Sequence, residues 1–449
     1  MDMMVFGILL FALQCMYWLI GRRASQQIEG NKDYFLSGRG VSFFPLMMTF
    51  LATQVGGGLV LGAADEAFRY GWSVLFYPLG VALGLIILGL GVGRKIAQFP
   101  VSTVAQILEV VYRSPLLKKI ASLFSIISLF MILVGQIVGS YKFLLAIGFS
   151  NPFLFILFWT TVILYTVRGG LKAVISIDIA QAVLFSAIFL FCFAYIKYSS
   201  PVIAPVAFDS FALGSSKLTS WLLLPLLFMV IEQDMGQRCF AGKSPRVVSQ
   251  ATLCAGILTF LVVLVPVYLG VVGRALNIDV PPGASVLMTV IAQLTNPWVT
   301  AIVGCAVLAA IISTATSLIN AISSNISQDF SFFEKRENPR VVQGITLGLS
   351  IGAIFFAFYC NNIVDVLLQS YELSVSCLFV PIFIALFKKR GYFLSGLFSI
   401  MAGLLGFFMF KFISIPFPTE IVSLALSLAG YGVGELIERL RSQEIEQTL

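Results

Sequence analysis

The sequence predicts an all-α polytopic membrane protein with thirteen membrane-spanning helices. Of its 449 residues, 59% are hydrophobic and 11% are charged, and the mean hydropathy is +0.98. A soluble domain is nearer half apolar and a quarter charged. Thirteen apolar segments are each near the ~20 residues that a helix needs to cross a bilayer. They lie at about 3–20, 43–65, 72–93, 120–147, 152–167, 173–196, 219–237, 248–273, 298–328, 341–359, 363–387, 392–412 and 419–437.

The placement of the basic residues agrees with this count and orients the chain. Twenty-two of the 28 Lys and Arg residues fall in the connections on one side and in the C-terminal tail. The other side carries Arg69, Lys142, Lys197, Lys217, Arg274 and Lys411. Because cytoplasmic connections carry an excess of Lys and Arg, we expect an outside N-terminus and a cytoplasmic C-terminus in a plasma or inner membrane. Topology thus explains the net charge of +7 without a nucleic-acid partner.

Composition also narrows the chemistry that the chain can perform. It contains no histidine, which excludes histidine proton relays and histidine metal sites. Its seven cysteines are scattered without a CxxC pair, so we interpret them as small apolar core residues and expect no transition-metal site. No paired carboxylate motif such as DxxD lies in the spans. We therefore expect no enzyme, and no obligate protein partner is evident beside the lipid bilayer.

The second span carries three consecutive glycines, Gly56 to Gly58, within TFLATQVGGGLVLG at 49–62. Glycine costs about 1 kcal/mol against alanine in a helix, and a loosened backbone in lipid must find internal hydrogen-bond partners. The stretch therefore predicts a broken helix whose carbonyls line a cavity, as in secondary transporters. The alternative is that the glycines only allow close helix packing.

The ninth span carries a cluster of hydroxyl groups in AAIISTATS at 309–317. Ser313, Thr314 and Ser317 lie on roughly one helix face. Hydroxyls and backbone carbonyls are the neutral oxygen ligands that a monovalent cation accepts, so the cluster predicts an ion site beside the broken helix. The alternative is that these hydroxyls bond to their own helix or to neighbouring helices.

The sixth span carries a carboxylate inside the membrane. A basic glycine turn, 168–170, leads into this span, and Asp178 lies about two turns inside it. An intramembrane carboxylate indicates a functional site by default. The alternative is a structural ion pair with Lys172 or Arg168.

The seventh span ends in the polar run EQDMGQR at 232–238. Gly236 and this run predict a second interrupted helix, with Glu232 as the deeper pocket residue. Asp234 and Arg238 are spaced i, i+4, so the simpler interpretation of these two is a local ion pair.

The two interrupted helices each begin a block of five spans, and five is odd, so the blocks have opposite orientations. This predicts an inverted-topology repeat, as in many secondary transporters. We expect repeats at 41–197 and 198–390. Residues 1–40 form the N-terminal flanking helix and loop, and 391–449 form two C-terminal flanking helices and a tail. The connections at 198–218 and 274–297 are expected to be extracellular.

With these residues in view, nearly the whole chain resembles the sodium/solute symporter family, which has a LeuT-like 5+5 inverted repeat with flanking helices. The resemblance is carried by the 52–62 stretch, GGLKAV…D…Q at 169–181, QR…A…K at 237–243 and AAIISTATS at 309–317. Within the family, VGGGLVLGAADEA looks most like the choline-transporter branch. That branch is expected to carry aromatic residues where Gln54 and Glu232 stand here.

The resemblance implies a sodium ion between spans two and nine. Its ligands would be the carbonyls of Ala52, Val55 and Ala310 and the side chains of Ser313 and Thr314. Some family members hold a second sodium, and the matching positions here are Asp178, Ser313, Thr316 and Ser317. The solute pocket is expected at Gln54, Gly57, Glu232 and Gln233.

The predicted function is a sodium-coupled symporter that imports a small polar organic solute by alternating access. The polar pair Gln54 and Glu232 suits a solute with an amine or several hydroxyls, of the amino acid, amine, sugar or osmolyte type. Two alternatives stay open at this point. One is a proton-coupled symporter that uses Asp178 or Glu232, and the other is a non-transporting membrane sensor of the same fold.

Overall fold

The computed structural model describes residues 1–26, 31–148, 151–199, 214–330, 339–360, 362–413 and 417–448. Within these ranges the chain is helical, and its β-structure is limited to an isolated bridge between Val41 and Gly242. Most of the predicted extracellular connection at 198–218 lies outside the described residues, as do the basic residues Lys335 and Arg336.

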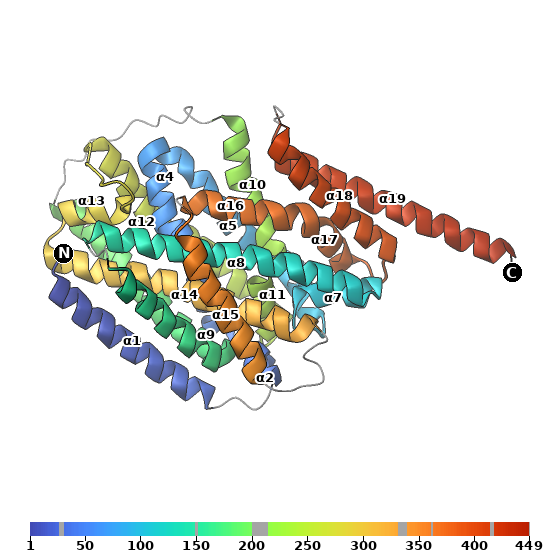
Figure 1. Ribbon diagram of the computed structural model, residues 1–449, viewed down its shortest axis with the longest axis horizontal. Coiled ribbons are helices and arrows are strands. Elements are labelled where there is room, and N and C mark those ends of the chain that lie inside the picture. The colour runs from blue at the N-terminus through green and yellow to red at the C-terminus, as the bar shows by residue number, and fades with distance from the viewer. Residues whose placement is uncertain are drawn as a thin grey trace.

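The described helical elements follow one another along the chain in a single bundle (Figure 1). In chain order they are α1 (Met3–Ser25), α2 (Asn31–Leu36), η1 (Ser37–Arg39), α3 (Phe43–Gln54), η2 (Gly58–Gly62), α4 (Ala63–Tyr70), η3 (Gly71–Leu75), α5 (Phe76–Ile87), η4 (Leu88–Val92), α6 (Gly93–Gln98), α7 (Val104–Tyr112), α8 (Pro115–Ala146), α9 (Pro152–Ser199), α10 (Ser215–Ile231), α11 (Gln233–Ala241), α12 (Pro245–Ala275), α13 (Val286–Leu294), α14 (Pro297–Asp329), α15 (Pro339–Ala357), α16 (Ile363–Ser374), η5 (Val375–Phe379), α17 (Val380–Phe387), α18 (Phe393–Phe412) and α19 (Thr419–Thr448).

The described residues contain nine helices that are long and apolar enough to cross a membrane, or ten if α10 and α11 count as one bent span. Counted by helix length and apolar composition, the described residues therefore give fewer spans than the thirteen predicted. The predicted span at 43–65 is split between α3 and the helix that follows it. The span at 152–167 keeps only a short apolar helix, Phe155–Leu164, and the span at 341–359 keeps only Gln343–Ala357.

Three of the long helices begin with the same type of N-terminal cap. Ser114 of α8, Ser244 of α12 and Asn296 of α14 each accept a hydrogen bond from a backbone N–H three residues on. A proline follows each of these cap residues. Such a cap satisfies a backbone donor that the helix leaves free, and proline fits the first helical position because its missing N–H is not needed there. Local sequence therefore sets where these helices start.

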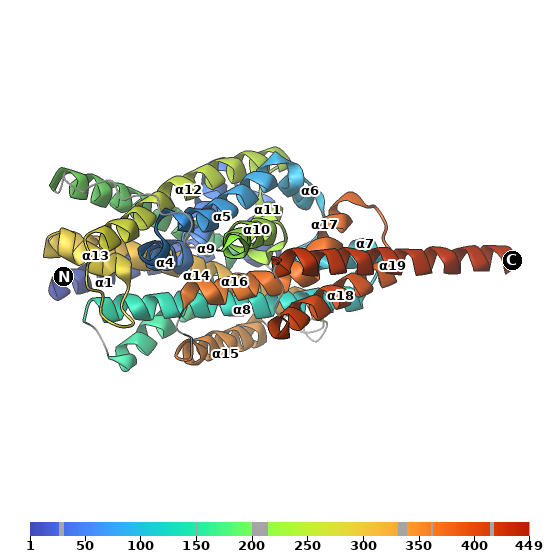
Figure 2. The ribbon, with the colours of Figure 1, turned by 90° about the horizontal axis from the view of Figure 1, so that it is seen from above.

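The helix α14 lies at the centre of the molecule. Nearly every side chain from Val299 to Ile326 is buried, and α14 packs against α8, α9, α1 and α3. The helix α1 lies along one edge in Figure 1, and the paired helices α18 and α19 lie on the opposite side, where α19 extends away from the bundle (Figures 1 and 2). These outer helices expose large apolar side chains such as Phe11, Leu405 and Leu428, as lipid-facing helices do. The hydroxyl-rich stretch of α14 is thus sealed inside the protein.

Candidate ion and solute site

The second predicted span breaks where its glycines lie. The helix α3 ends at Gln54, and Val55 leaves helical geometry with φ −80° and ψ 74°. The N–H of Gly56 turns back to the carbonyl of Gln54 at 2.9 Å, and the chain resumes as the π-helical turn η2. The N–H of Gly57, which the break releases, donates to Oε1 of Gln136 on α8 at 2.6 Å. A buried side chain therefore satisfies the backbone group that lipid could not.

Close packing is a second role of the same glycines. A Cβ atom on Gly56 would lie 2.7 Å from Oε1 of Gln136 and 2.8 Å from Cβ of Thr314. A Cβ atom on Gly58 would lie 2.9 Å from the hydroxyl of Tyr77. Real Cβ atoms do not approach this closely, because protein interiors are already packed to crystal-like density. The two interpretations of the triple glycine are therefore both present, the broken helix and the close approach of α8 and α14.

Neutral oxygen atoms gather where α3 ends against α14. The hydroxyl of Ser313 lies 2.8 Å from the carbonyl oxygen of Ala52 and 2.8 Å from that of Ala310. The hydroxyl of Thr314 lies 2.8 Å from the carbonyl oxygen of Thr53 and 3.5 Å from that of Ala52. All these residues are buried. Carbonyls of an unwound segment together with hydroxyls are the donor set by which transporters coordinate sodium.

Four of the five residues predicted for the first sodium site meet at this point, and Thr53 joins them. Val55 is buried at the break, but the two hydroxyls contact Ala52 and Thr53 rather than Val55. The donor set suits a monovalent cation, because it is made of neutral oxygens. Within the described ranges, no group of three or more His, Cys, Asp or Glu side chains could hold a metal ion.

A buried guanidinium joins four helices next to this site. Arg238 of α11 donates from Nε to the hydroxyl of Thr49 at 2.9 Å and from Nη2 to the hydroxyl of Ser317 at 2.6 Å. The same Nη2 lies 3.3 Å from Oδ2 of Asp178. Nη1 of Arg238 donates to the backbone carbonyl of Asp234 at 3.0 Å, and not to the Asp234 carboxylate. The predicted local pairing of Asp234 with Arg238 is therefore wrong at the side-chain level.

Asp178 therefore pairs with a residue that sequence analysis did not consider. The alternatives considered for Asp178 were Lys172 and Arg168, and the side chain of Arg168 lies outside the described part of the chain. The hydroxyl of Thr49 also donates to Asp178. A charged side chain deep in a span needs such a partner, because an unpaired buried charge is costly.

The four residues predicted for a second sodium do not converge on one point. Asp178 and Ser317 meet at Arg238, as described above. Thr316 instead donates to the backbone carbonyl of Ser313 in its own helix at 3.0 Å, which is the back-bonding alternative for hydroxyls in helices. The hydroxyl of Ser313 faces Ala52.

The seventh span is interrupted at Glu232. The helices α10 and α11 meet there at a bend of 44°, and Glu232 has extended backbone geometry, with φ −65° and ψ 133°. The interruption was predicted, but it does not fall at Gly236, which lies inside α11. At Gly236 an added Cβ would meet the side chain of Val104. This glycine thus allows α11 to pack near α7.

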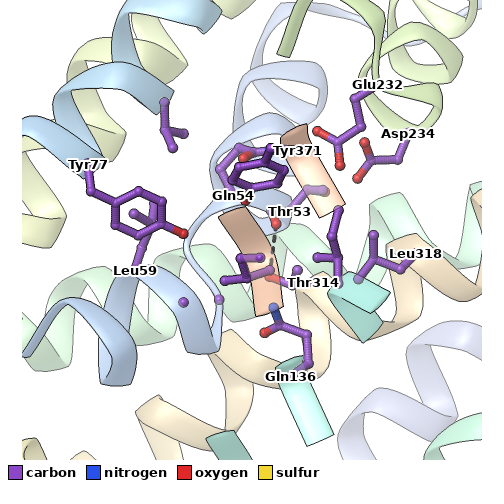
Figure 3. A pocket seen from close by; sticks show the side chains of 15 residues that line it. Thr53, Gln54, Leu59, Tyr77, Gln136, Glu232, Asp234, Thr314, Leu318 and Tyr371 are labelled. Carbon is purple, nitrogen blue, oxygen red and sulfur yellow. Dashed lines mark hydrogen bonds between the residues drawn. The ribbon is translucent and has the colours of Figure 1, made fainter. Parts of the chain in front are cut away.

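A small cavity lies between the two breaks (Figure 3). Its volume is about 20 Å³, which is room for roughly one water molecule. Its polar lining residues are Thr53, Gln54, Tyr77, Gln136, Glu232, Asp234, Thr314 and Tyr371. The cavity therefore touches α3, η2, α5, α8, α11, α14 and α16, so both broken spans contribute to it.

Two of the four residues predicted for the solute pocket line this cavity, namely Gln54 and Glu232. Gln233 does not, because its Oε1 accepts from the backbone N–H of Val104 at 2.7 Å. Gly57 is not in the lining either, although Gly56 and Gly58 are. Gln54 and Glu232 of the predicted pocket therefore lie at this cavity, and the neighbouring Asp234, rather than Gln233, is in its lining.

Sequence analysis missed the aromatic part of the lining. The rings of Tyr77 and Tyr371 face the cavity (Figure 3), and Tyr371 stacks on Phe228 with ring centroids 4.5 Å apart. The choline-transporter branch was expected to carry aromatic residues at positions 54 and 232, and here they come from α5 and α16 instead. No local motif surrounds either tyrosine, so nothing in the sequence pointed to them.

Comparison with known proteins places this chain among transporters. The model of a family described as the sodium:solute symporter family matches residues 34–403. The chain is 25% identical to the sodium/pantothenate symporter of Haemophilus influenzae over 325 residues, covering 68% of this chain and 67% of that protein. It is 24% identical to the osmoregulated proline transporter OpuE of Bacillus subtilis over 403 residues, covering 83% and 82%.

Solved structures show the same fold at low sequence identity. A substrate-bound, outward-open Na⁺-coupled sialic acid symporter superposes with a TM-score of 0.78 at 14% identity, covering 97% of this chain and 98% of that one. A nucleobase-cation-symport-1 family transporter in a closed conformation superposes with a TM-score of 0.63 at 13% identity, covering 92% and 95%. The architecture is therefore LeuT-like, as the sequence resemblance implied.

Proposed function

The chain belongs to the sodium:solute symporter family and is a sodium-coupled symporter of a small solute, and we propose that its coupling sodium binds where α3 ends against α14. Family membership decides between the sodium-coupled symporter, the proton-coupled symporter and the non-transporting sensor that the sequence left open. It favours sodium over a proton as the coupling ion, and a transporter over a non-transporting sensor or an enzyme.

One observation carries the proposal, which is that the ion site and the cavity share residues. Thr53 and Thr314 supply oxygens to the candidate sodium site and also line the cavity. A cation held between them would fix the broken span against α14 and complete one wall of the cavity. Two ligands that stabilise the same arrangement raise each other's affinity, and this is the thermodynamic basis of coupling.

We assign one sodium rather than two. At the positions predicted for a second ion, Arg238 already supplies a positive charge between Asp178 and Ser317. A second cation in the same place would meet electrostatic repulsion from the guanidinium, and burial would strengthen that repulsion.

We further propose that all thirteen apolar segments cross the membrane, with the N-terminus outside and the C-terminus in the cytoplasm. The broken second span and the two short ones would cross as helices supported by their neighbours, as irregular spans do when they are buried in protein. The repeats would then be 41–197 and 198–390, flanked by 1–40 and 391–449. The similarity of VGGGLVLGAADEA to the choline-transporter branch stays a prediction.

The solute is a small polar organic molecule that binds between Gln54 and Glu232. The matched relatives are named for pantothenate, proline and sialic acid, which are all small polar solutes. The cavity has room for about one water molecule, so its walls must separate before a solute enters. This requirement fits alternating access, in which the cavity opens to one side of the membrane at a time.

Sodium binding to purified protein in lipid nanodiscs tests the proposal without knowledge of the solute. We expect wild-type protein to bind ²²Na⁺ saturably. The double variant Ser313→Ala and Thr314→Ala should bind it at least about tenfold more weakly, since each lost ligand removes a favourable interaction with a cation. Thr300→Ala is a matched control, because this hydroxyl lies in the same helix and bonds to the carbonyl of Asn296.

An unchanged sodium affinity in the double variant would overturn the assignment of the site. Loss of sodium affinity in Thr300→Ala to the same extent would point to a general defect of α14 instead.

A further inference from the structure

We propose that the transported solute carries a positive charge with N–H donors, as a primary ammonium or a guanidinium group, and that Glu232 and Asp234 bind it. The inference rests on the proposed function, because it names the class of solute for the cavity described above. It goes further than that function, which leaves amines, sugars and other polar solutes equally possible.

The two carboxylates stand side by side at the cavity (Figure 3). Glu232 lies at the break between α10 and α11 and Asp234 in the first turn of α11, and both side chains are buried, with Glu232 5% and Asp234 0% exposed. Oε2 of Glu232 and both carboxyl oxygens of Asp234 meet no donor in hydrogen-bond geometry among the described residues, and the two carboxyl groups lie next to each other. Three buried acceptor atoms therefore face one small space, and leaving such atoms unpaired is costly.

The nearby cation is engaged elsewhere. The side chain of Arg238 contacts Thr49, Ser317 and Asp178, and it reaches Asp234 only at the backbone carbonyl. Two buried carboxylates toward the ends of the spans have partners of their own, since Asp65 pairs with Lys142 and Glu66 lies 3.6 Å from Lys217. No ion pair in the described ranges reaches the side chain of Glu232 or Asp234.

Charge balance around the cavity points to a cationic solute. Asp178, Glu232 and Asp234 are acidic, and Arg238 compensates one of them, which leaves two negative charges when all three are ionised. A sodium ion at Ser313 would compensate one, and a singly charged solute would compensate the other. Uncompensated charge inside a span is strongly unfavourable, so with all three carboxylates ionised the loaded state is neutral when both ligands are cations.

The remaining lining favours N–H donors over a quaternary ammonium. Tyr77 and Tyr371 line the same cavity as the carboxylates (Figure 3), and aromatic rings attract organic cations. A quaternary ammonium has no N–H, so it would leave the carboxyl oxygens without hydrogen bonds. A primary ammonium or a guanidinium satisfies these oxygens through charge-assisted hydrogen bonds, which are roughly twice as strong as neutral ones.

The alternative to two ionised carboxylates is that Glu232 and Asp234 share one proton, and this alternative predicts a different solute preference. Two adjacent carboxyl groups can share one proton, because their like charges disfavour double ionisation. The pair would then be less negative, and hydroxyl groups of a neutral solute would serve as well as an ammonium. The test therefore compares solutes that differ only in this group.

The experiment measures solute binding to wild-type protein in nanodiscs at saturating sodium, by isothermal calorimetry. The probes are matched pairs, ethanolamine with ethylene glycol and 4-aminobutan-1-ol with butane-1,4-diol, together with agmatine and choline. We expect the amino member of at least one pair to bind roughly 30-fold more tightly than its diol, as for a buried charge pair. Choline should bind more weakly than ethanolamine.

Variants connect this preference to the two carboxylates. Glu232→Gln and Asp234→Asn should each reduce the preference for the amino member about tenfold or more, because each removes charge while keeping shape. Glu420→Gln is the control, since Glu420 is also a buried carboxylate but bonds to Ser220 away from the cavity. It should keep the wild-type preference.

The inference is overturned if no pair prefers its amino member, whether both members bind equally or neither binds. It is equally overturned if the double variant Glu232→Gln, Asp234→Asn keeps the preference. Binding of ²²Na⁺ on the same samples separates the two proposals. Normal sodium binding without a preference for charged solutes rejects this inference alone, whereas absent sodium binding rejects the proposed function.

Discussion

Replacing Gly56 by alanine should weaken sodium binding more than it weakens the fold. The added Cβ would lie 2.7 Å from Oε1 of Gln136 and 2.8 Å from Cβ of Thr314, and closer still to the Thr314 hydroxyl. Gly56 does not have a positive φ, so alanine meets no backbone penalty, and the effect is steric. Overpacking of this kind costs about 1–3 kcal/mol, which corresponds to roughly a 5- to 150-fold change in affinity if it falls on the ion site.

The cost should fall on sodium because the methyl group meets Thr314 and Gln136. Thr314 supplies a candidate sodium ligand, and Gln136 holds the N–H of Gly57 at the break. Relief of the clash requires α14 or the broken segment to move, and either movement separates Thr314 from the carbonyl of Thr53. The assay is the sodium concentration that half-maximally raises the unfolding temperature in nanodiscs, together with ²²Na⁺ binding.

Two glycine variants serve as matched controls. At Gly57 the nearest atom to an added Cβ is Oε1 of Gln136 at 3.1 Å, the end of a flexible side chain. Gly57→Ala should therefore have a smaller effect than Gly56→Ala. At Gly7, on α1, nothing lies within 4 Å, and Gly7→Ala should bind sodium like wild type. A sodium affinity of Gly56→Ala equal to that of Gly7→Ala would refute the close approach as a determinant of the ion site.

Two further predictions concern stability. Arg238→Met leaves Asp178 buried without its ion pair and should lower the free energy of unfolding by about 3–5 kcal/mol. Adding Asp178→Asn should restore part of this stability, as measured by thermal unfolding. A double variant no more stable than Arg238→Met would argue against the ion pair. Gly403→Ala would drive a Cβ into the backbone carbonyl of Ser376 and should cost about 1–3 kcal/mol. Because α18 packs chiefly against α19 and η5, the folded fraction of Gly403→Ala should keep wild-type sodium affinity, and a weakened affinity would contradict this separation.

Local composition was sufficient to predict the elements of the site. Apolar length placed the helices, because crossing a bilayer sets a minimum number of apolar residues. The triple glycine at 56–58 predicted the break, because glycine weakens a helix through its own backbone freedom. The hydroxyl cluster at 313–317 predicted an oxygen-rich surface on α14, because helical spacing alone places these neighbouring side chains on one face.

By length and hydropathy, the described residues give nine or ten clear spans, fewer than the thirteen that the sequence predicts. Apolar composition divides 152–196 into two spans, 152–167 and 173–196, but it does not determine how the backbone turns between them. In α9 the turn falls at Gly170, whose φ is 58°, and a Cβ there would meet the backbone of Tyr34. The glycine was visible in the sequence, but the neighbour that requires it was not.

The sequence by itself determined the class of protein, the two broken spans and the hydroxyl-rich partner helix, since each of these depends on residues that are adjacent in the chain. Only the tertiary structure decided how the polar side chains are paired. Asp178 meets Arg238, which is 60 positions away, and Gln136 meets Gly57 across 79 positions. The break at Glu232 also resets the helical phase, so that Asp234 lines the cavity while Gln233 turns toward Val104. Side-chain direction after a break depends on how the helices pack, and no periodicity in the sequence carries that information.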